Sequence, residues 1–175
     1  REGGPTYDPT FFDASGPHRG IKRALTDGGI RVPFLARWPG KIKAGAVSEH
    51  VGYFGDMMAT WNELSGGKTP AGVALDSISV VPTLLGRGEQ AKHPYLYWEF
   101  YEQGVSQAVL VEGRWKGIRL KTTDAPVALY EVAADPGERD DVAAKNPAVV
   151  ARVKEIMRTA RVDNAHWKMP AAAAK

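Results

Sequence analysis

The stretch YLYWEFYEQGVSQAVLVEGRWKGIRLKTTDAPVALYEV, from Tyr95 to Val132, holds four short apolar runs separated by turn residues. The runs are Tyr95–Tyr101, Ala108–Val111, Trp115–Leu120 and Val127–Val132. Short runs rich in aromatic and β-branched residues are typical of strands. Gly113 and the segment 122–126 supply the turns that an antiparallel meander requires. The sequence therefore predicts a four-stranded antiparallel sheet.

A helix is expected to follow this sheet. Asn146-Pro147 combines a capping residue with a proline at the first helical position. Apolar residues then recur at helical spacing, namely Val149, Val150, Val153, Ile156, Met157 and Ala160. A helix that covers one face of a four-stranded sheet is a sound α+β arrangement. We therefore predict a compact α+β unit over residues 91–162 and a disordered tail over 163–175.

Residues 1–90 read differently, as pieces of a larger α/β domain. Residues 1–20 are rich in glycine and proline and predict an irregular loop. Ile30–Trp38 predicts a strand, and Ser79–Gly86 predicts a short helix that ends at Gly86. The apolar stripe between Phe54 and Leu64 predicts a core-facing helix that ends at Gly66-Gly67. A single strand cannot satisfy its own backbone groups. The strand is therefore expected to pair with a sheet outside these residues.

Composition excludes several classes of function. The 175 residues include 23 basic and 20 acidic ones without a basic block, which argues against a nucleic-acid partner. There is no cysteine, so thiolate metal sites, disulfides and cysteine nucleophiles are excluded. No apolar run approaches the length of about 18 residues that a membrane span needs. Because the chain starts at Arg1 without a targeting signal, we expect a fragment of a longer protein.

A lysine lies between glycines in the segment GIKRALTDGGIRVP, residues 20–33. Lys22 follows Gly20 by two residues and precedes the pair Gly28-Gly29 by six. Closely spaced glycines let backbone approach backbone, or a ligand, where a Cβ atom would clash. A lysine on such a framework can be held as a fixed cation, so Lys22 is a candidate for contact with an anion.

The same segment resembles the lysine segment of the sulfatases, which reads Gly-x-Lys, four residues, then Glu-Gly-Gly-x-Arg-x-Pro. Asp27 stands where that pattern has glutamate, which keeps the charge and shortens the reach. Further motifs similar to bacterial arylsulfatases follow in the family's order, at Arg31–Ile42, Asp56–Gly66, Asp76–Gly86 and within Trp115–Glu138. Ala59 replaces the proline of the second of these motifs. The chain thus resembles the C-terminal part of an arylsulfatase-type sulfatase of the alkaline-phosphatase-like superfamily.

This resemblance implies hydrolysis of a sulfate ester by a parent enzyme that uses formylglycine and a divalent cation, usually Ca²⁺. It implies that Lys22 is a catalytic residue that contacts the sulfate. The family's metal-binding acidic segments and catalytic histidine segments have no match here, so we expect no metal or cofactor site in this chain. The isolated chain is expected to be inactive, and its expected partners are the N-terminal part of the sulfatase domain and a small sulfated substrate. A periplasmic or secreted location would suit a bacterial sulfatase.

Two side chains before Lys22 call for interpretation. Ser15-Gly16-Pro17-His18-Arg19 matches the formylglycine signature Ser/Cys-x-Pro-x-Arg. The family's signature lies early in the protein and leads into a helix, whereas this copy lies in the loop before the lysine, so we reject Ser15 as the nucleophile. His18 is close enough to Lys22 in sequence to be a candidate substrate-binding residue, and an exposed loop histidine is the alternative.

Two other functions remain open from the sequence. The first is a binding module that uses Lys22, Arg23 and Arg31 to hold a sulfated or phosphorylated ligand. The second is a part of a related phosphoryl or phosphonate hydrolase. The elements Trp38-Pro39-Gly40 and Asp135–Glu138 favour the sulfatase branch.

Overall fold

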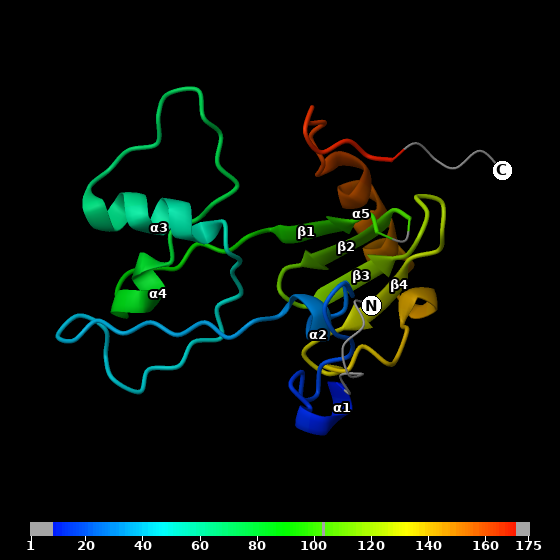
Figure 1. The fold of residues 1–175 in the computed structure, drawn as a ribbon, viewed down its shortest axis with the longest axis horizontal. Coiled ribbons are helices and arrows are strands. Elements are labelled where there is room, and N and C mark those ends of the chain that lie inside the picture. The colour runs from blue at the N-terminus through cyan, green and yellow to red at the C-terminus, as the bar shows by residue number, and fades with distance from the viewer. Residues whose placement is uncertain (1–8, 103, 171–175) are drawn as a thin grey trace, which may run out of the picture. The chain divides into compact units, whose positions relative to one another are not determined.

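The computed structural model describes residues 9–102 and 104–170, which form two compact units (Figure 1). Unit 1 combines the segment that ends at Val32 with the segment from Tyr95 onward, and unit 2 is Pro33–Pro94. The sequence predicted a division near residue 90, with the first ninety residues together. The structure instead groups residues 9–32 with the C-terminal sheet, because this segment buries Leu25 against the sheet.

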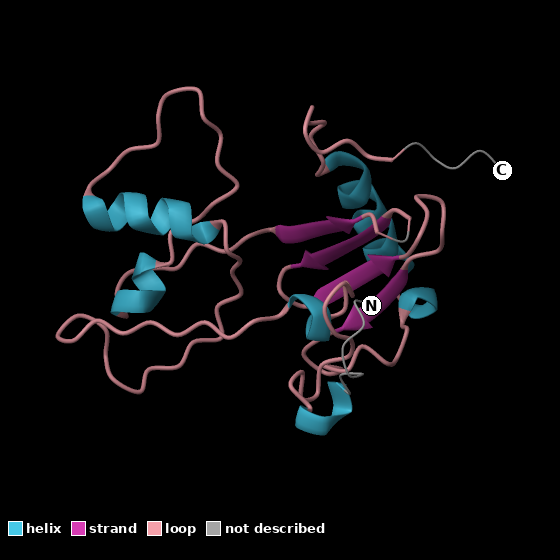
Figure 2. Cartoon of the chain, in the orientation of Figure 1, coloured by secondary structure: helices cyan, strands magenta, loops and turns pink. Residues whose placement is uncertain are grey.

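Unit 1 is built on a four-stranded antiparallel sheet, as predicted (Figure 2). Its strands are β1 (Tyr95–Phe100), β2 (Ser106–Val111), β3 (Trp115–Arg119) and β4 (Ala128–Glu131). They pair in sequence order, with Val109 opposite Tyr97 on one side and Gly117 on the other. The chain therefore forms a simple meander.

The helix α5 (Pro147–Thr159) covers one face of this sheet. The buried cluster between them consists of Val109, Val111, Val127, Leu129, Val153, Ile156 and Met157. Pro147 lies in the first turn as expected, after the short 3-10 helix η1 (Ala143–Lys145). Asn146 does not cap α5 with its side chain, because its amide donates instead to the Val142 carbonyl at 3.0 Å.

The opposite face of the sheet is covered by the segment that precedes unit 2. This segment contains α1 (Pro9–Phe12) and the single turn α2 (Asp27–Ile30). Its Leu25 packs with Ala108, Ile118 and Tyr130, which belong to three different strands. Both faces of the small sheet are thus buried, by elements from opposite ends of the chain (Figure 1).

Unit 2 contains α3 (Asp56–Ser65) and α4 (Val81–Leu85). Gly66 and Gly86 end these helices in the left-handed conformation, in agreement with the sequence. The prediction that the apolar stripe of α3 is core was wrong. Its buried residues are Asp56 and Thr60, whereas Phe54, Met58 and Trp61 are exposed. Helical spacing identified the helix but not the surface that would cover its stripe.

The predicted strand Ile30–Trp38 does not form in the structure. Ile30 ends α2, and residues 31–38 carry no helix or strand. Val32, Phe34 and Leu35 are exposed, the last with 89% of its surface accessible. A strand needs a hydrogen-bonded neighbour, and the described residues offer none to this segment.

Among the helices of the described residues, none has the length and apolar character to cross a membrane.

The contact of Gly117 with α5 generates a test of this packing. A Cβ at Gly117 would lie 2.5 Å from Cγ1 of Val153, so we expect Gly117→Ala to destabilise the protein by about 1–3 kcal/mol through overpacking. Combining it with Val153→Ala should recover part of this loss, since the new methyl group would occupy the vacated space. Urea unfolding of the single and double variants measures this coupling, and strictly additive losses would contradict it.

Candidate functional site

Lys22 lies on an exposed loop, and Leu25 of the same loop packs on the face of the sheet opposite α5. Gly20 and Arg23 flank it with positive φ angles of 93° and 81°, so the loop turns sharply on both sides of the lysine. The side chain of Leu25, three residues later, is buried in the sheet face. The loop is therefore anchored beside Lys22 while the lysine itself faces solvent.

The glycine pair is required by close contacts with this loop. A Cβ at Gly28 would lie 2.3 Å from the Gly20 carbonyl oxygen, and one at Gly29 would lie 2.2 Å from the Ala24 carbonyl oxygen. The Gly28 amide donates to the Arg19 carbonyl at 2.9 Å. Only glycine permits this approach, so the pair holds the backbone on both sides of Lys22.

Asp27 connects the lysine loop, residues 18–31, to two buried charged side chains, Lys116 on β3 and Glu138 in the turn after β4. The Lys116 ammonium donates to Oδ1 of Asp27, and its Nζ lies 3.0 Å from Oε1 of Glu138. Oε2 of Glu138 accepts the backbone N–H of Asp27 at 2.7 Å. Lys116 and Glu138 are completely buried. Arg31, 3.7 Å from the Asp27 carboxylate, adds the second positive charge, so the group of four is electrically balanced.

Lys116 and Glu138 lie within the motif region Trp115–Glu138, but the sequence alone predicts no role for either residue. One signal was available. In β3 the residues Lys116 and Ile118 point to the same face, because side chains alternate along a strand, and Ile118 is in the core. A lysine at such a position needs a buried partner of opposite charge, and Glu138 is the acidic residue of the nearby turn that provides it.

The structure gives Ser15 and His18 contacts with backbone atoms. The Ser15 hydroxyl is within hydrogen-bond distance of the carbonyl oxygens of Gly20 and Gly28, at 3.1 and 3.3 Å. Nδ1 of His18 lies 3.2 Å from the carbonyl oxygen of Pro136. Ser15 thus braces the loop around Lys22, and His18 ties it to the turn that carries Glu138. The role of His18 in substrate binding stays a prediction.

A cavity of about 530 Å³ lies between the lysine loop and the sheet. Leu25, Ile118 and Tyr130 contribute to its apolar part. Two arginines at this cavity are already engaged: Arg23 pairs with Glu102 at 2.9 Å, and the guanidinium of Arg19 lies 5.1 Å from the centre of the Tyr130 ring.

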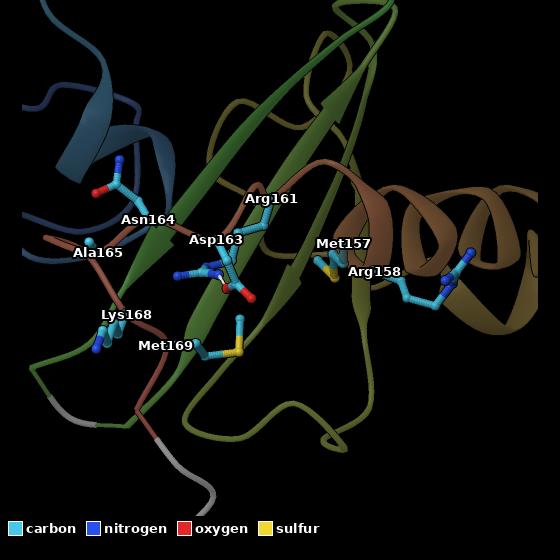
Figure 3. Close-up of a pocket in the computed structure, with 8 residues that line it drawn as sticks. All are labelled: Met157, Arg158, Arg161, Asp163, Asn164, Ala165, Lys168 and Met169. Carbon is cyan, nitrogen blue, oxygen red and sulfur yellow. Dashed lines mark hydrogen bonds and ion pairs between the residues drawn. The ribbon is translucent and has the colours of Figure 1, made fainter.

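A second hollow of about 720 Å³ lies between the end of α5 and the segment that follows it (Figure 3). Its lining residues are Met157, Arg158, Arg161, Asp163, Asn164, Ala165, Lys168 and Met169. Both arginines already form ion pairs: Arg158 pairs with Glu155, and Arg161 pairs with Glu99. This hollow therefore offers no free guanidinium to an anion.

The segment after α5 is held against the sheet by Trp167. Its ring stacks on Tyr101 with 5.1 Å between ring centres, and its indole N–H donates to Glu99 at 3.0 Å. The backbone carbonyl of Trp167 accepts from Arg161 at 2.6 Å. The sequence predicted a disordered tail over 163–175. Residues 163–170 include these contacts, and 171–175 lie outside the described residues.

Unit 2 has its own polar cluster around Asp56, the first residue of α3. Its completely buried carboxylate accepts the backbone N–H groups of Tyr53 and Ile78 at 3.0 Å each and contacts Nε2 of His93 at 2.8 Å. Burial lowers the pKa of His50, an effect that Asp56 opposes. These contacts connect the start of α3 to the two segments that flank α4 and β1, which is a structural role.

The described residues contain no group of three or more His, Cys, Asp or Glu side chains that could hold a metal ion. The divalent cation implied by the resemblance therefore has no fitting set of ligands among them.

Comparison with known proteins bears on this geometry. The family model described as N-sulphoglucosamine sulphohydrolase, C-terminal, matches residues 17–163. The chain belongs to the sulfatase family. Its matched region includes the lysine loop, unit 2, the sheet and α5, so the family comparison covers both units.

Sulfatase relatives extend this result. The chain is 26% identical to the N-acetylgalactosamine-6-O-sulfatase of Bacteroides thetaiotaomicron, over 91% of this chain and 35% of the relative. It is 28% identical to the mouse N-acetylgalactosamine-6-sulfatase (75% of this chain, 30% of the relative) and to bovine arylsulfatase A (81% and 32%). The chain thus spans about a third of the length of these relatives.

Solved structures agree with this fold. A Bacteroides thetaiotaomicron structure from a core genetic locus for the metabolism of multiple glycosaminoglycans matches with a TM-score of 0.70 and 28% identity, over 83% of this chain and 32% of its own. Ps i-CgsB in complex with k-i-k-neocarrahexaose matches with a TM-score of 0.72 and 25% identity, over 82% and 31%. The fold of this sulfatase chain therefore resembles that of about a third of each of these longer chains.

The close approach at Gly28 predicts the effect of a single methyl group. Gly28→Ala would bring Cβ against three backbone carbonyls, so we expect the lysine loop to open and trypsin to cleave faster after Lys22 and Arg23. Gly67→Ala is the matched control, since its Cβ would meet no closer atom than the Ser65 hydroxyl, at 3.1 Å. Equal cleavage rates in the two variants would contradict this assignment.

The burial of His50 predicts a pH dependence. Burial lowers the pKa of His50 below 6.5, the ordinary value for histidine, so near and below that pH the unfolded chain binds more protons than the folded chain. The free energy of unfolding should therefore decrease as the pH falls below 6.5. Between pH values of about 7.5 and 5, this decrease should be smaller for His50→Gln than for the wild type. Urea unfolding at both pH values measures this difference, and identical losses would refute it.

Proposed function

We propose that this chain supplies Lys22 to the active site of a sulfatase that hydrolyses a sulfate ester. The observation that supports the proposal most directly is an exposed ammonium on a loop whose backbone is fixed on both sides, by the glycine pair and by Asp27. A lysine is a compact point cation, and a fixed cation stabilises negative charge that develops on a transferred group without reorganising during the reaction.

The proposed reaction divides between this chain and the rest of the enzyme. In the complete site, formylglycine would supply the nucleophile and a divalent cation would supply Lewis acidity. The contribution of this chain is to hold the Lys22 ammonium next to a sulfate oxygen. The substrate we propose is a small sulfated compound, in keeping with the named activities of the relatives.

The remaining part of a sulfatase domain is the partner that we propose for this chain. Unit 2 exposes large apolar side chains, among them Phe34, Leu35, Phe54 and Trp61. Exposed apolar surface of this kind is typical of interaction sites. The relatives are about three times as long as this chain, so they contain the additional polypeptide that could cover these residues.

The alternative of an independent anion-binding module receives less support. That hypothesis used Lys22, Arg23 and Arg31 together. Arg23 is paired with Glu102 and Arg31 with Asp27, so two of the three cations are already balanced. A single lysine remains, which fits one contact within a larger site.

The test is turnover of 4-nitrophenyl sulfate with Ca²⁺ by the longer sulfatase polypeptide that we propose contains this chain. Lys22→Ala should lower kcat/KM by about 10²-fold, the loss typical of one charge-stabilising group. Lys145→Ala, at an exposed lysine of η1, should leave it unchanged.

The 175-residue chain alone should give only background hydrolysis in the same assay. Turnover by this chain well above background, or a Lys22→Ala variant that keeps the activity of the control, would overturn the proposal.

A further inference from the structure

We propose that Lys116 and Glu138 are positioning residues for Lys22, acting through Asp27. The side chains of Asp27, Lys116 and Glu138 meet where the lysine loop contacts the sheet and the turn that follows it. This inference rests on the proposed function, since it assigns to the buried charges the task of holding the lysine that contacts sulfate.

Asp27 is held by both of its polar parts. Its carboxylate accepts from the Lys116 ammonium, and its backbone N–H donates to Glu138 at 2.7 Å. Glu138 in turn lies 3.0 Å from the same ammonium. The three groups form a closed triangle of contacts, so Asp27 cannot shift without losing a contact with at least one buried charge.

The burial of these groups makes such a shift unfavourable. Lys116 and Glu138 have no exposure, and Asp27 only 16% in its side chain. A charge that loses its partner inside a protein is strongly destabilising, because neither water nor another counterion replaces it. The triangle therefore favours one position of the Asp27 backbone over nearby alternatives.

The position of Asp27 reaches Lys22 through backbone contacts. Asp27 is followed directly by Gly28, whose amide donates to the Arg19 carbonyl and where an added Cβ would lie 2.3 Å from the Gly20 carbonyl oxygen. The Ser15 hydroxyl lies within hydrogen-bond distance of the carbonyl oxygens of both Gly20 and Gly28. Movement of Asp27 therefore moves the backbone on which Lys22 is mounted, five residues earlier.

A merely structural role for the triangle would stabilise unit 1 as a whole. If the triangle has a positioning role, its loss loosens residues 18–31 while the packing of α5 on the other face persists. The triangle then also affects catalysis only through Lys22. These two expectations distinguish a positioning role from a merely structural one.

The first experiment is hydrogen exchange, read by mass spectrometry, on the 175-residue chain. Glu138→Gln keeps the shape of the side chain and removes its charge, and Asp27→Asn does the same from the loop side. Each should raise amide exchange at least fivefold in peptides covering 18–31 and leave peptides of α5 unchanged. Glu131→Gln is the control, because it removes one charge of an ion pair with Arg114 that lies in the same unit but outside both residues 18–31 and α5.

Two results of this experiment would overturn the proposal. Unchanged exchange in 18–31 would show that the triangle does not hold the loop. An equal rise in α5 would show a general loss of stability instead of local positioning.

The second experiment is a double-mutant cycle in the longer sulfatase, measured as kcat/KM for 4-nitrophenyl sulfate. Glu138→Gln should lower kcat/KM about tenfold when Lys22 is present and by less than twofold in the Lys22→Ala background. Equal losses in both backgrounds would overturn the positioning role. If Lys22→Ala alone had no effect, the proposed function would fail, while the exchange experiment would still decide whether the triangle holds the loop.

Discussion

The buried ammonium of Lys116 is the constraint on which the organisation of unit 1 depends. It lies on a central strand and is neutralised by one carboxylate from the turn after the sheet and another from the loop before unit 2. A lysine at this position cannot be hydrated, so it requires both segments to be in place. The charge thereby fixes the turn of Glu138 and the lysine loop to the face of the meander opposite α5.

The sheet, the closing helix and the ends of α3 and α4 followed from the sequence, because each depends on local signals. Short apolar runs with turns predicted the meander, and Gly66 and Gly86 marked the helix ends. The failures share one cause. Ile30–Trp38 and the stripe of α3 were assigned as strand and core from their apolar character, but apolar character does not name the surface that covers it. In the described residues Val32, Phe34, Leu35, Met58 and Trp61 of these segments remain exposed.

The candidate site shows the same division. The segment around Lys22 was recognisable from its glycines, and the family comparison confirms the resemblance that those residues suggested. The partners of Asp27 were not predicted, since Lys116 and Glu138 are 89 and 111 residues away along the chain. Only the folded arrangement shows that a conservative change from glutamate to aspartate still places a carboxylate on a buried ammonium.

The separation of the sheet's two covers along the chain has a consequence for the order of folding. The meander and α5 are close in sequence and can assemble through short loops. The segment that carries Leu25 is separated from the sheet along the chain by all of unit 2. Contacts that close long loops form more slowly than local ones. A newly formed sheet would thus have one face buried under α5 and the other exposed to water until the lysine loop packs onto it. The loop that presents the proposed catalytic lysine is then also the last piece to complete the core.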